Sequence, residues 1–138
     1  VGTFFWLNRN DFEPADLSKF AYELPKKPSI AILPFSNLSG DLTKQYLSDG
    51  LTQNITGTLS KSSDIFVIAT GSVIKEQENA SNNVEISEKL GVRFLVTGGV
   101  QQANNDLRVT VELVDTVLGK NIWANKGAYS ELSPLDGL

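Results

Sequence analysis

The sequence predicts an α/β (α+β) two-layer sandwich, in the order β-α-β-α-β-β-β, with the helices packed mainly on one face of a mixed sheet. Three observations predict it. Short apolar runs at 30–33 and 65–69 are typical of buried strands. Apolar residues every four positions over 47–59 indicate a helix between them. From residue 93 onward, alternating residues separated by turn signals indicate an antiparallel meander.

Length and composition favour one globular domain that lacks the usual catalytic side chains. The chain has 138 residues, of which 41% are hydrophobic and 20% charged. Its net charge of −4 argues against binding to nucleic-acid phosphates. It has no Cys, His or Met, which excludes disulfides, thiolate or imidazole metal ligands, and Ser–His or Cys–His couples. We expect no catalysis, cofactor or metal in this segment.

Residues 1–28 are interpreted as a membrane-proximal arm and linker. Residues 1–7 are apolar and aromatic and include Phe4, Phe5 and Trp6. They are too few to span a bilayer, which needs about twenty residues, but Trp and Phe are typical of the interface where a membrane helix ends. The alternative is a short strand or an apolar arm packed on the domain. A short helical turn is expected within 15–22.

The core is expected to begin with the apolar run at 30–33, which Pro34 ends. A loop of cap and turn residues at 35–41 then leads into the first helix. The apolar stripe of this helix consists of Leu47, Leu51, Ile55 and Leu59. Gly50 and Gly57 each weaken a helix by about 1 kcal/mol relative to alanine. We therefore expect another element to approach the helix closely at both glycines.

The second half begins with the strand at 65–69 and continues through a polar stretch at 72–83 that fits no single element. Residues 84–90 predict a short helix that ends before Gly91. A strand at 93–101 and a turn at 104–106 follow. Within that strand the pair Gly98-Gly99 indicates a bulge or a crowded backbone.

The next strand, 107–114, alternates almost without interruption. One set of its residues faces the core: Leu107, Val109, Val111 and Leu113. The other set faces away: Arg108, Thr110 and Glu112. A turn around Gly119 leads to the last strand at 121–128.

The helix-free face of this sheet is the first candidate interaction surface. If Ile122 and Ala124 face inward, Trp123 lies with Arg108, Thr110 and Glu112 on that face. Trp is enriched at interface hot spots, and an open sheet face needs a cover. We expect this face and the arm with Phe4, Phe5 and Trp6 to contact a protein partner, with a second copy of the chain favoured. For Trp123 taken alone, the favoured interpretation is that it covers the sheet under the N-terminal arm, and an anchor for a partner is the alternative.

The loop between the first strand and the first helix is the second candidate. Its polar and turn residues are Asn37, Ser39, Gly40 and Asp41. Phosphates often bind at this position of α/β folds. The glycine spacing of dinucleotide sites and of P-loops is absent, so helix capping is the favoured interpretation. As a ligand site, the Pro34–Asp41 loop would make the domain a small-molecule or nucleotide receptor.

Several separated motifs occur in the order found in a known bacterial family. They are Lys27 to Phe35, Asn37 to Asp41, Asp49 to Thr52, Phe66 to Ala69, Leu90 to Phe94, Thr97 to Val100 and Trp123-Ala124. Over roughly residues 27–129 the chain resembles TolB amino-terminal-like domains of bacterial signalling proteins. Such domains commonly accompany class III adenylate/guanylate cyclase domains or winged-helix regulators, often before tetratricopeptide repeats. Thr97 departs from this pattern, because an acidic residue is usual there.

The resemblance implies a non-catalytic sensory or protein-interaction domain of a membrane-bound, cyclase-type signalling protein. It would regulate that protein by binding or self-association, and the cyclase active site would lie in another part of the full protein. The expected organisation is an arm and linker at 1–28, the domain at 29–130, and at 131–138 the start of a linker to a following domain.

The expected partners follow from the same interpretation. We expect a protein partner or a homodimer and no nucleic acid. Contact with the membrane is expected only through a preceding transmembrane helix. A single crossing after a cytoplasmic cyclase would place the domain on the periplasmic side of the inner membrane, and a cytoplasmic location is the alternative.

Overall fold

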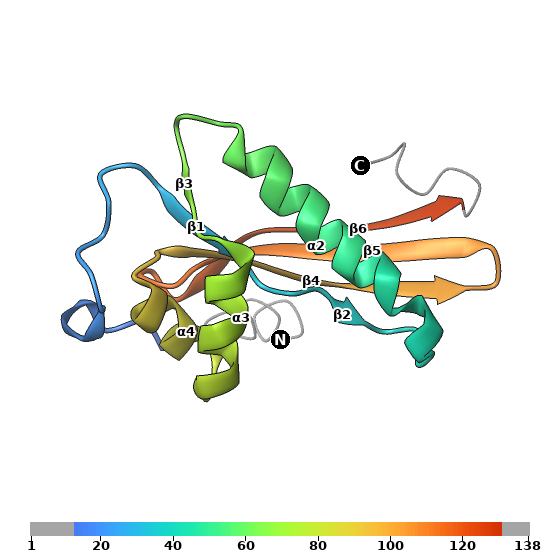
Figure 1. Ribbon diagram of the computed structural model, residues 1–138, viewed down its shortest axis with the longest axis horizontal. Coiled ribbons are helices and arrows are strands. Elements are labelled where there is room, and N and C mark those ends of the chain that lie inside the picture. The colour runs from blue at the N-terminus through green and yellow to red at the C-terminus, as the bar shows by residue number, and fades with distance from the viewer. Residues whose placement is uncertain (1–12, 131–138) are drawn as a thin grey trace, which may run out of the picture.

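The computed structural model describes residues 13–130, which form a mixed six-stranded sheet with helices packed against it (Figure 1). The helices are the 3₁₀ turns η1 (Leu17–Lys19) and η2 (Leu42–Lys44) and the α-helices α2 (Gln45–Ser60), α3 (Thr70–Asn79) and α4 (Asn83–Leu90). The strands are β1 (Ser29–Ile32), β2 (Ser36–Asn37), β3 (Phe66–Val67), β4 (Phe94–Ala103), β5 (Asp106–Asp115) and β6 (Lys120–Ser130).

The strand order is β3-β1-β4-β5-β6, with β2 also paired to β4. β1 runs parallel to β3 and β4, and β2 continues along the same edge of β4. Pro34, which has no amide hydrogen to donate to the ladder, lies between β1 and β2. β4, β5 and β6 are antiparallel neighbours. The predicted α/β class, mixed sheet and helix–sheet order are therefore confirmed, and the first strand ends before Pro34 as predicted. The short strand β2 lies where only a loop was expected.

The larger core lies between α2 and one face of the sheet. Ile30, Ile32 and Val96 contribute from the parallel strands, and Val109 from β5. The predicted inward set of β5 faces this core. Phe35, which is 2% exposed, belongs to the same core. The predicted helical stripe packs on this core through Leu47, Leu51, Ile55 and Leu59.

The helices lie on both faces of the sheet, whereas the sequence predicted that they pack mainly on one face. Ala31 and Leu95 point away from α2 into a second core, where they meet Val73 of α3 and Ile86 of α4. β1 therefore lies between two helical layers, and all four of its residues are buried. In Figure 1, α3 and α4 lie near the end of the sheet where β1 and β3 pair. The β4–β5 hairpin extends toward the opposite end (Figure 1).

Two glycine predictions had different outcomes. Gly50 and Gly57 of α2 have no neighbouring atom within 4 Å of the position that a Cβ would take, so the expected close approach is wrong for the described residues. The crowded backbone expected at Gly98-Gly99 is confirmed. A Cβ on Gly98 would lie 2.6 Å from the ring of Phe35, and one on Gly99 would lie 2.5 Å from the side chain of Leu38.

The polar stretch at 72–83, for which no element was predicted, is mostly helical. α3 begins at Thr70 without a side-chain cap, and the loop after Asn79 leads to α4, whose cap is Asn82. The predicted helix end at Gly91 is confirmed, because Gly91 adopts the left-handed φ of 71°. The turn expected within 15–22 is present as η1.

Candidate interaction surfaces

Three of the predicted surface residues share one face of the β4–β5 hairpin. In the antiparallel register Arg108 lies opposite Gln101, Thr110 opposite Gly99, and Glu112 opposite Thr97. Because neighbouring residues of a strand alternate between faces, these three side chains point away from the α2 core. We call this surface, formed by Thr97, Gly99, Gln101, Arg108, Thr110 and Glu112, the open face.

Trp123 does not belong to the open face, which corrects the sequence-based placement. It lies directly opposite Leu113, whose side chain packs on the α2 side of the sheet. The register shifts between Leu113 and Val114, so Ile122 becomes an extra residue that reverses the alternation. Trp123 is 51% exposed and Ile122 47% exposed, and both lie on the outermost strand.

A hollow of about 840 Å³ lies beside the open face. Among the described residues, the segment 13–19, α4 and strands β4 to β6 line it. Five carboxylates and one lysine contribute to this lining: Glu13, Asp16, Glu85, Glu88, Glu112 and Lys19. Several of the carboxylates already have partners. Glu88 accepts a hydrogen bond from the amide of Asp16 at 2.9 Å, and Glu85 pairs with Lys89 at 3.1 Å.

The predicted ligand loop uses its polar groups within the fold. The side chain of Asn37 accepts from the amide of Ser39 at 3.0 Å and donates to the carbonyl of Asp41 at 2.9 Å. The hydroxyl of Ser39 accepts from the amide of Gln102 at 2.8 Å. Gly40 has a φ of 72°, which favours glycine. The arrangement is that of a turn tied to β4.

Asp41 acts as the cap of η2. Its Oδ1 accepts from the hydroxyl of Thr43 at 2.7 Å and from the amide of Thr43 at 2.9 Å. These hydrogen bonds stabilise the carboxylate, so the pKa of Asp41 is lowered, chiefly by the hydroxyl. A negative charge here does not favour a phosphate ligand. The geometry therefore agrees with capping, and no contact in the loop favours the receptor alternative.

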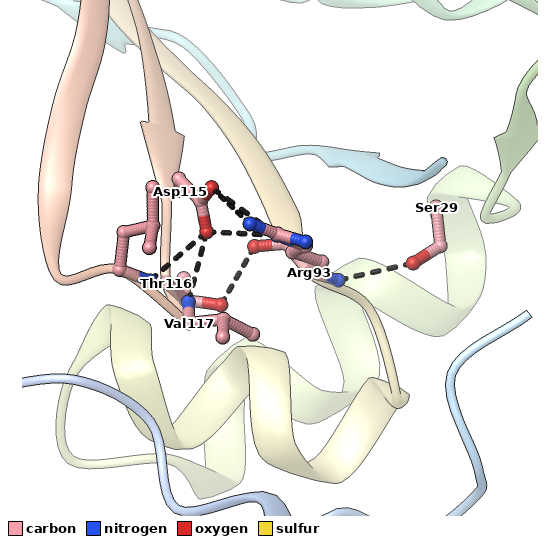
Figure 2. A network of polar contacts seen from close by, with 6 residues as sticks. Ser29, Arg93, Asp115, Thr116 and Val117 are labelled. Atoms are coloured by element: carbon pink, nitrogen blue, oxygen red, sulfur yellow. Dashed lines mark hydrogen bonds and ion pairs between the residues drawn. The ribbon is translucent and has the colours of Figure 1, made fainter. Parts of the chain in front are cut away.

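A polar network beside the start of β4 fixes the turn between β5 and β6 (Figure 2). Arg93 donates from Nη2 to Oδ2 of Asp115 at 2.8 Å and from Nε to Oδ1 at 3.0 Å. Oδ1 also accepts from the amides of Val117 and Leu118 at 3.0 and 3.1 Å. The carbonyl of Arg93 accepts from the hydroxyl of Thr116 at 2.6 Å.

The network lowers the pKa of Asp115 although its side chain is only 3% exposed. Burial alone raises this pKa, but the hydrogen bond from Arg93 and those from Leu118 and Val117 outweigh it. The Arg93 amide donates to Ser29 at 3.0 Å, which ties the network to β1 (Figure 2). We interpret the network as structural, because each of its hydrogen bonds connects a strand, or the residue that precedes it, to another strand or to the turn before β6.

Phe4, Phe5 and Trp6 lie outside the described residues, so their predicted contact role stays a prediction. Within residues 13–130, no three His, Cys, Asp or Glu side chains are grouped as a metal site would require. No helix in that same range has both the length and the apolar character needed to cross a membrane.

Two features of these surfaces had no sequence-based prediction. Leu38 is 53% exposed and lies over Gly99, beside a hollow of about 290 Å³ on the open face. The sequence signal that could have predicted the contact between Leu38 and Gly99 is a bulky apolar residue in the loop together with a glycine in the strand. The carboxylates beside the open face come from three separate segments, so no local spacing could have joined them.

Residues 26–128 match the protein family described as HilA/YgeH-like transcriptional regulator, second domain. The chain is also 40% identical over 104 residues to a Rhizobium meliloti (strain 1021) protein described as "Putative adenylate cyclase 3". That match includes 75% of this chain but only 18% of the relative. The chain is thus similar to one segment of a much longer protein.

Two solved structures share the fold. The lipoprotein GNA1162 from Neisseria meningitidis has a TM-score of 0.60 at 19% identity, over 75% of this chain and 80% of that one. TolB from Acinetobacter baumannii has a TM-score of 0.54 at 17% identity, over 86% of this chain and 30% of that one. These structures confirm the fold that the resemblance to TolB amino-terminal-like domains implied. The expected link to cyclase-type proteins agrees with the description of the Rhizobium meliloti relative.

Proposed function

Because the chain belongs to the family of HilA/YgeH-like transcriptional regulator second domains, we propose that it is a non-catalytic interaction domain of a longer signalling protein. Its role is to bind a protein partner or a second copy of itself and thereby regulate an output domain elsewhere in that protein. An adenylate cyclase is the output that its 40% identity to the Rhizobium meliloti relative supports.

One observation carries this proposal. The same kind of domain accompanies two unlike outputs, since the family is named for transcriptional regulators and the relative for a cyclase. A domain that serves both is expected to supply binding rather than either chemistry. Its net charge of −4 makes binding to DNA phosphates unfavourable, so the domain is not the DNA-reading part of such a regulator.

The surface chemistry supports binding over catalysis. The open face carries one cation, one carboxylate and small polar groups, and the β6 edge beside it carries exposed apolar side chains. A half-exposed tryptophan on an outer strand is typical of a modest protein interface.

The first test is a nucleotide cyclase assay of the purified chain. We expect no conversion of ATP or GTP to a cyclic product with Mg²⁺ or Mn²⁺, because the domain supplies binding and the catalytic chemistry belongs to another part of the full protein. A catalytic cyclase domain assayed in parallel shows that the conditions support the reaction. Activity that follows the concentration of this chain through two independent purifications would contradict the proposal.

The location that we propose is the periplasmic side of the inner membrane. The aromatic run at residues 1–7 is typical of the membrane interface, and the fold relative GNA1162 is described as a lipoprotein. Reporter fusions after Leu138 of the full-length protein test this. We expect signal from a reporter active only in the periplasm, whereas signal from a cytoplasmic reporter alone would reverse the assignment.

A further inference from the structure

The strand β6 forms a long edge of the sheet. It spans Lys120–Ser130, is the last strand in the sheet order, and pairs with β5 on its inner side. No strand among residues 13–130 pairs with its outer side. An unpaired edge presents alternating N–H and C=O groups to another extended chain. The opposite edge offers far less, because β3 consists only of Phe66–Val67.

The central part of β6, residues 121–125, lacks the charges and prolines that usually protect an edge strand, and Lys120 and Lys126 flank it. Soluble proteins place charges or prolines on long edges to prevent pairing with other chains. Residues 121–125 contain neither, and Ile122 and Trp123 are 47% and 51% exposed. The bulge at Ile122 turns Trp123 toward the α2 side, next to Leu113, where it extends the apolar surface to the edge.

We propose that the outer edge of β6 pairs antiparallel with the same edge of a second copy, which joins the two sheets across a two-fold axis. This inference rests on the proposed function and specifies its interface. An antiparallel pair of identical strands is self-complementary, because each backbone group meets its symmetry mate. Each copy also contributes one Trp123 to the shared surface, so the same anchor acts twice.

The size of this edge predicts a weak dimer. A strand of 11 residues extends about 37 Å at roughly 3.4 Å per residue, and a sheet is about 10 Å thick. Pairing along the whole edge buries on the order of 750 Å² in total, whereas a stable interface needs about 1,200 Å² or more. The isolated domain is therefore expected to dimerise only at high concentration. Two copies held together in a longer protein would pair readily, because tethering raises their effective concentration.

Single cysteines test the pairing directly, since the chain has none of its own. Asn125 lies at the middle of β6 and is exposed. Across an antiparallel two-fold near this point the Cα atoms lie about 4.5–5.5 Å apart, which suits a disulfide. We expect mild oxidation to cross-link the Asn125→Cys variant at least tenfold faster than Gln53→Cys, whose cysteine lies on the exposed side of α2. Equal rates, or faster linking through Gln53→Cys, would overturn the proposal.

Charge substitutions separate the edge from other modes of association. We expect Trp123→Lys to weaken the dimer at least tenfold by sedimentation. The matched control Phe66→Lys, which changes a 49% exposed aromatic on the opposite edge, should leave it unchanged. A dimer that tolerates Trp123→Lys and shows no preferential Asn125→Cys linking would overturn the edge assignment while self-association stands.

Hydrogen exchange identifies any other occupant of the edge. We expect the β6 amides to become more protected as protein concentration rises. Protection of the edge at all concentrations in a monomer would show that another part of the same chain occupies it, and would overturn the proposal. If the protein is a monomer whose β6 amides stay unprotected at every concentration, both the β6 pairing and self-association in general are overturned. The non-catalytic role is tested separately by the cyclase assay.

Discussion

Replacement of Gly98 by alanine is expected to destabilise the domain by roughly 3 kcal/mol. The new Cβ would press against the carbonyl oxygen of Thr110 and would lie 2.6 and 2.9 Å from ring atoms of Phe35. Neither neighbour has room to move, because the carbonyl belongs to the central β4–β5 ladder and Phe35 is 2% exposed. Overpacking of this kind forces backbone shifts. Urea unfolding measures the loss, and a thermal midpoint lower by about 10 °C should accompany it.

Two other alanine substitutions are matched controls. At Gly99 the Cβ would meet the end of Leu38, which is 53% exposed and free to rotate away. We expect Gly99→Ala to cost less than about 1 kcal/mol. At Gly57 the site is open, and alanine should stabilise α2 by about 0.5–1 kcal/mol. If Gly98→Ala unfolds within about 0.5 kcal/mol of the wild type, the described contact between Phe35 and β4 is wrong.

The contrast among these glycines shows where sequence-based prediction ended. Periodicity predicted the strands and the main helix because burial imposes a period of two or of about four on the residues themselves. It could not distinguish a glycine with a crowded neighbour from one facing solvent. Gly98 is crowded by Phe35 and by the neighbouring strand, whereas Gly57 of α2 has open space beside it, and these surroundings come from segments distant in the sequence.

The position of Trp123 shows a second physical limit. Alternation fixes the face of a residue only while the register is unbroken. One extra residue at Ile122 reverses every face on one side of it, and the local sequence has no glycine or proline to signal this bulge. The prediction that Arg108, Thr110 and Glu112 share a face is correct, because no bulge interrupts the pairing of β5 with β4.

The placement of the helices was also beyond the local pattern. The run at β1 is apolar at every position, which predicts burial without saying what covers each side. The structure shows α2 over Ile30 and Ile32, and α3 with α4 over Ala31. The open face is consequently limited to the far part of the β4–β5 hairpin. It still holds the three polar residues that sequence reasoning assigned to it.

Substitution of Asp115 by asparagine is expected to lower the free energy of unfolding by about 2–3 kcal/mol at neutral pH. The carboxylate is 3% exposed and accepts from Arg93 and from the amides of Val117 and Leu118. Asparagine is neutral and has only one side-chain oxygen, so it cannot accept both hydrogen bonds from Arg93. Its side-chain NH₂ group would lie against groups that are themselves donors. The side chain of Arg93 is 38% exposed and stays partly hydrated, so the loss of stability falls below that of a fully buried pair.

The surface pair Glu85–Lys89 is the matched control. Its charged atoms lie 3.1 Å apart, but both side chains are well exposed, at 34% and 38%. Solvent and salt screen such a pair, so Glu85→Gln should leave stability nearly unchanged. If the two substitutions have equal effects, the Arg93–Asp115 network does not stabilise the fold more than a surface pair does.

The effect of Asp115→Asn should depend on pH with a defined sign. The folded pKa of Asp115 lies below the ordinary aspartate value of 3.8, so in this range the unfolded chain binds the proton first. The stabilisation is then complete above that value and is lost as the pH falls toward the folded pKa. We expect the stability gap between wild type and variant to be constant from about pH 7 to about pH 5 and to narrow below about pH 4. Urea unfolding at several pH values measures this gap. A gap that widens with acidification would contradict the assigned direction of the shift and the role of Arg93 in it.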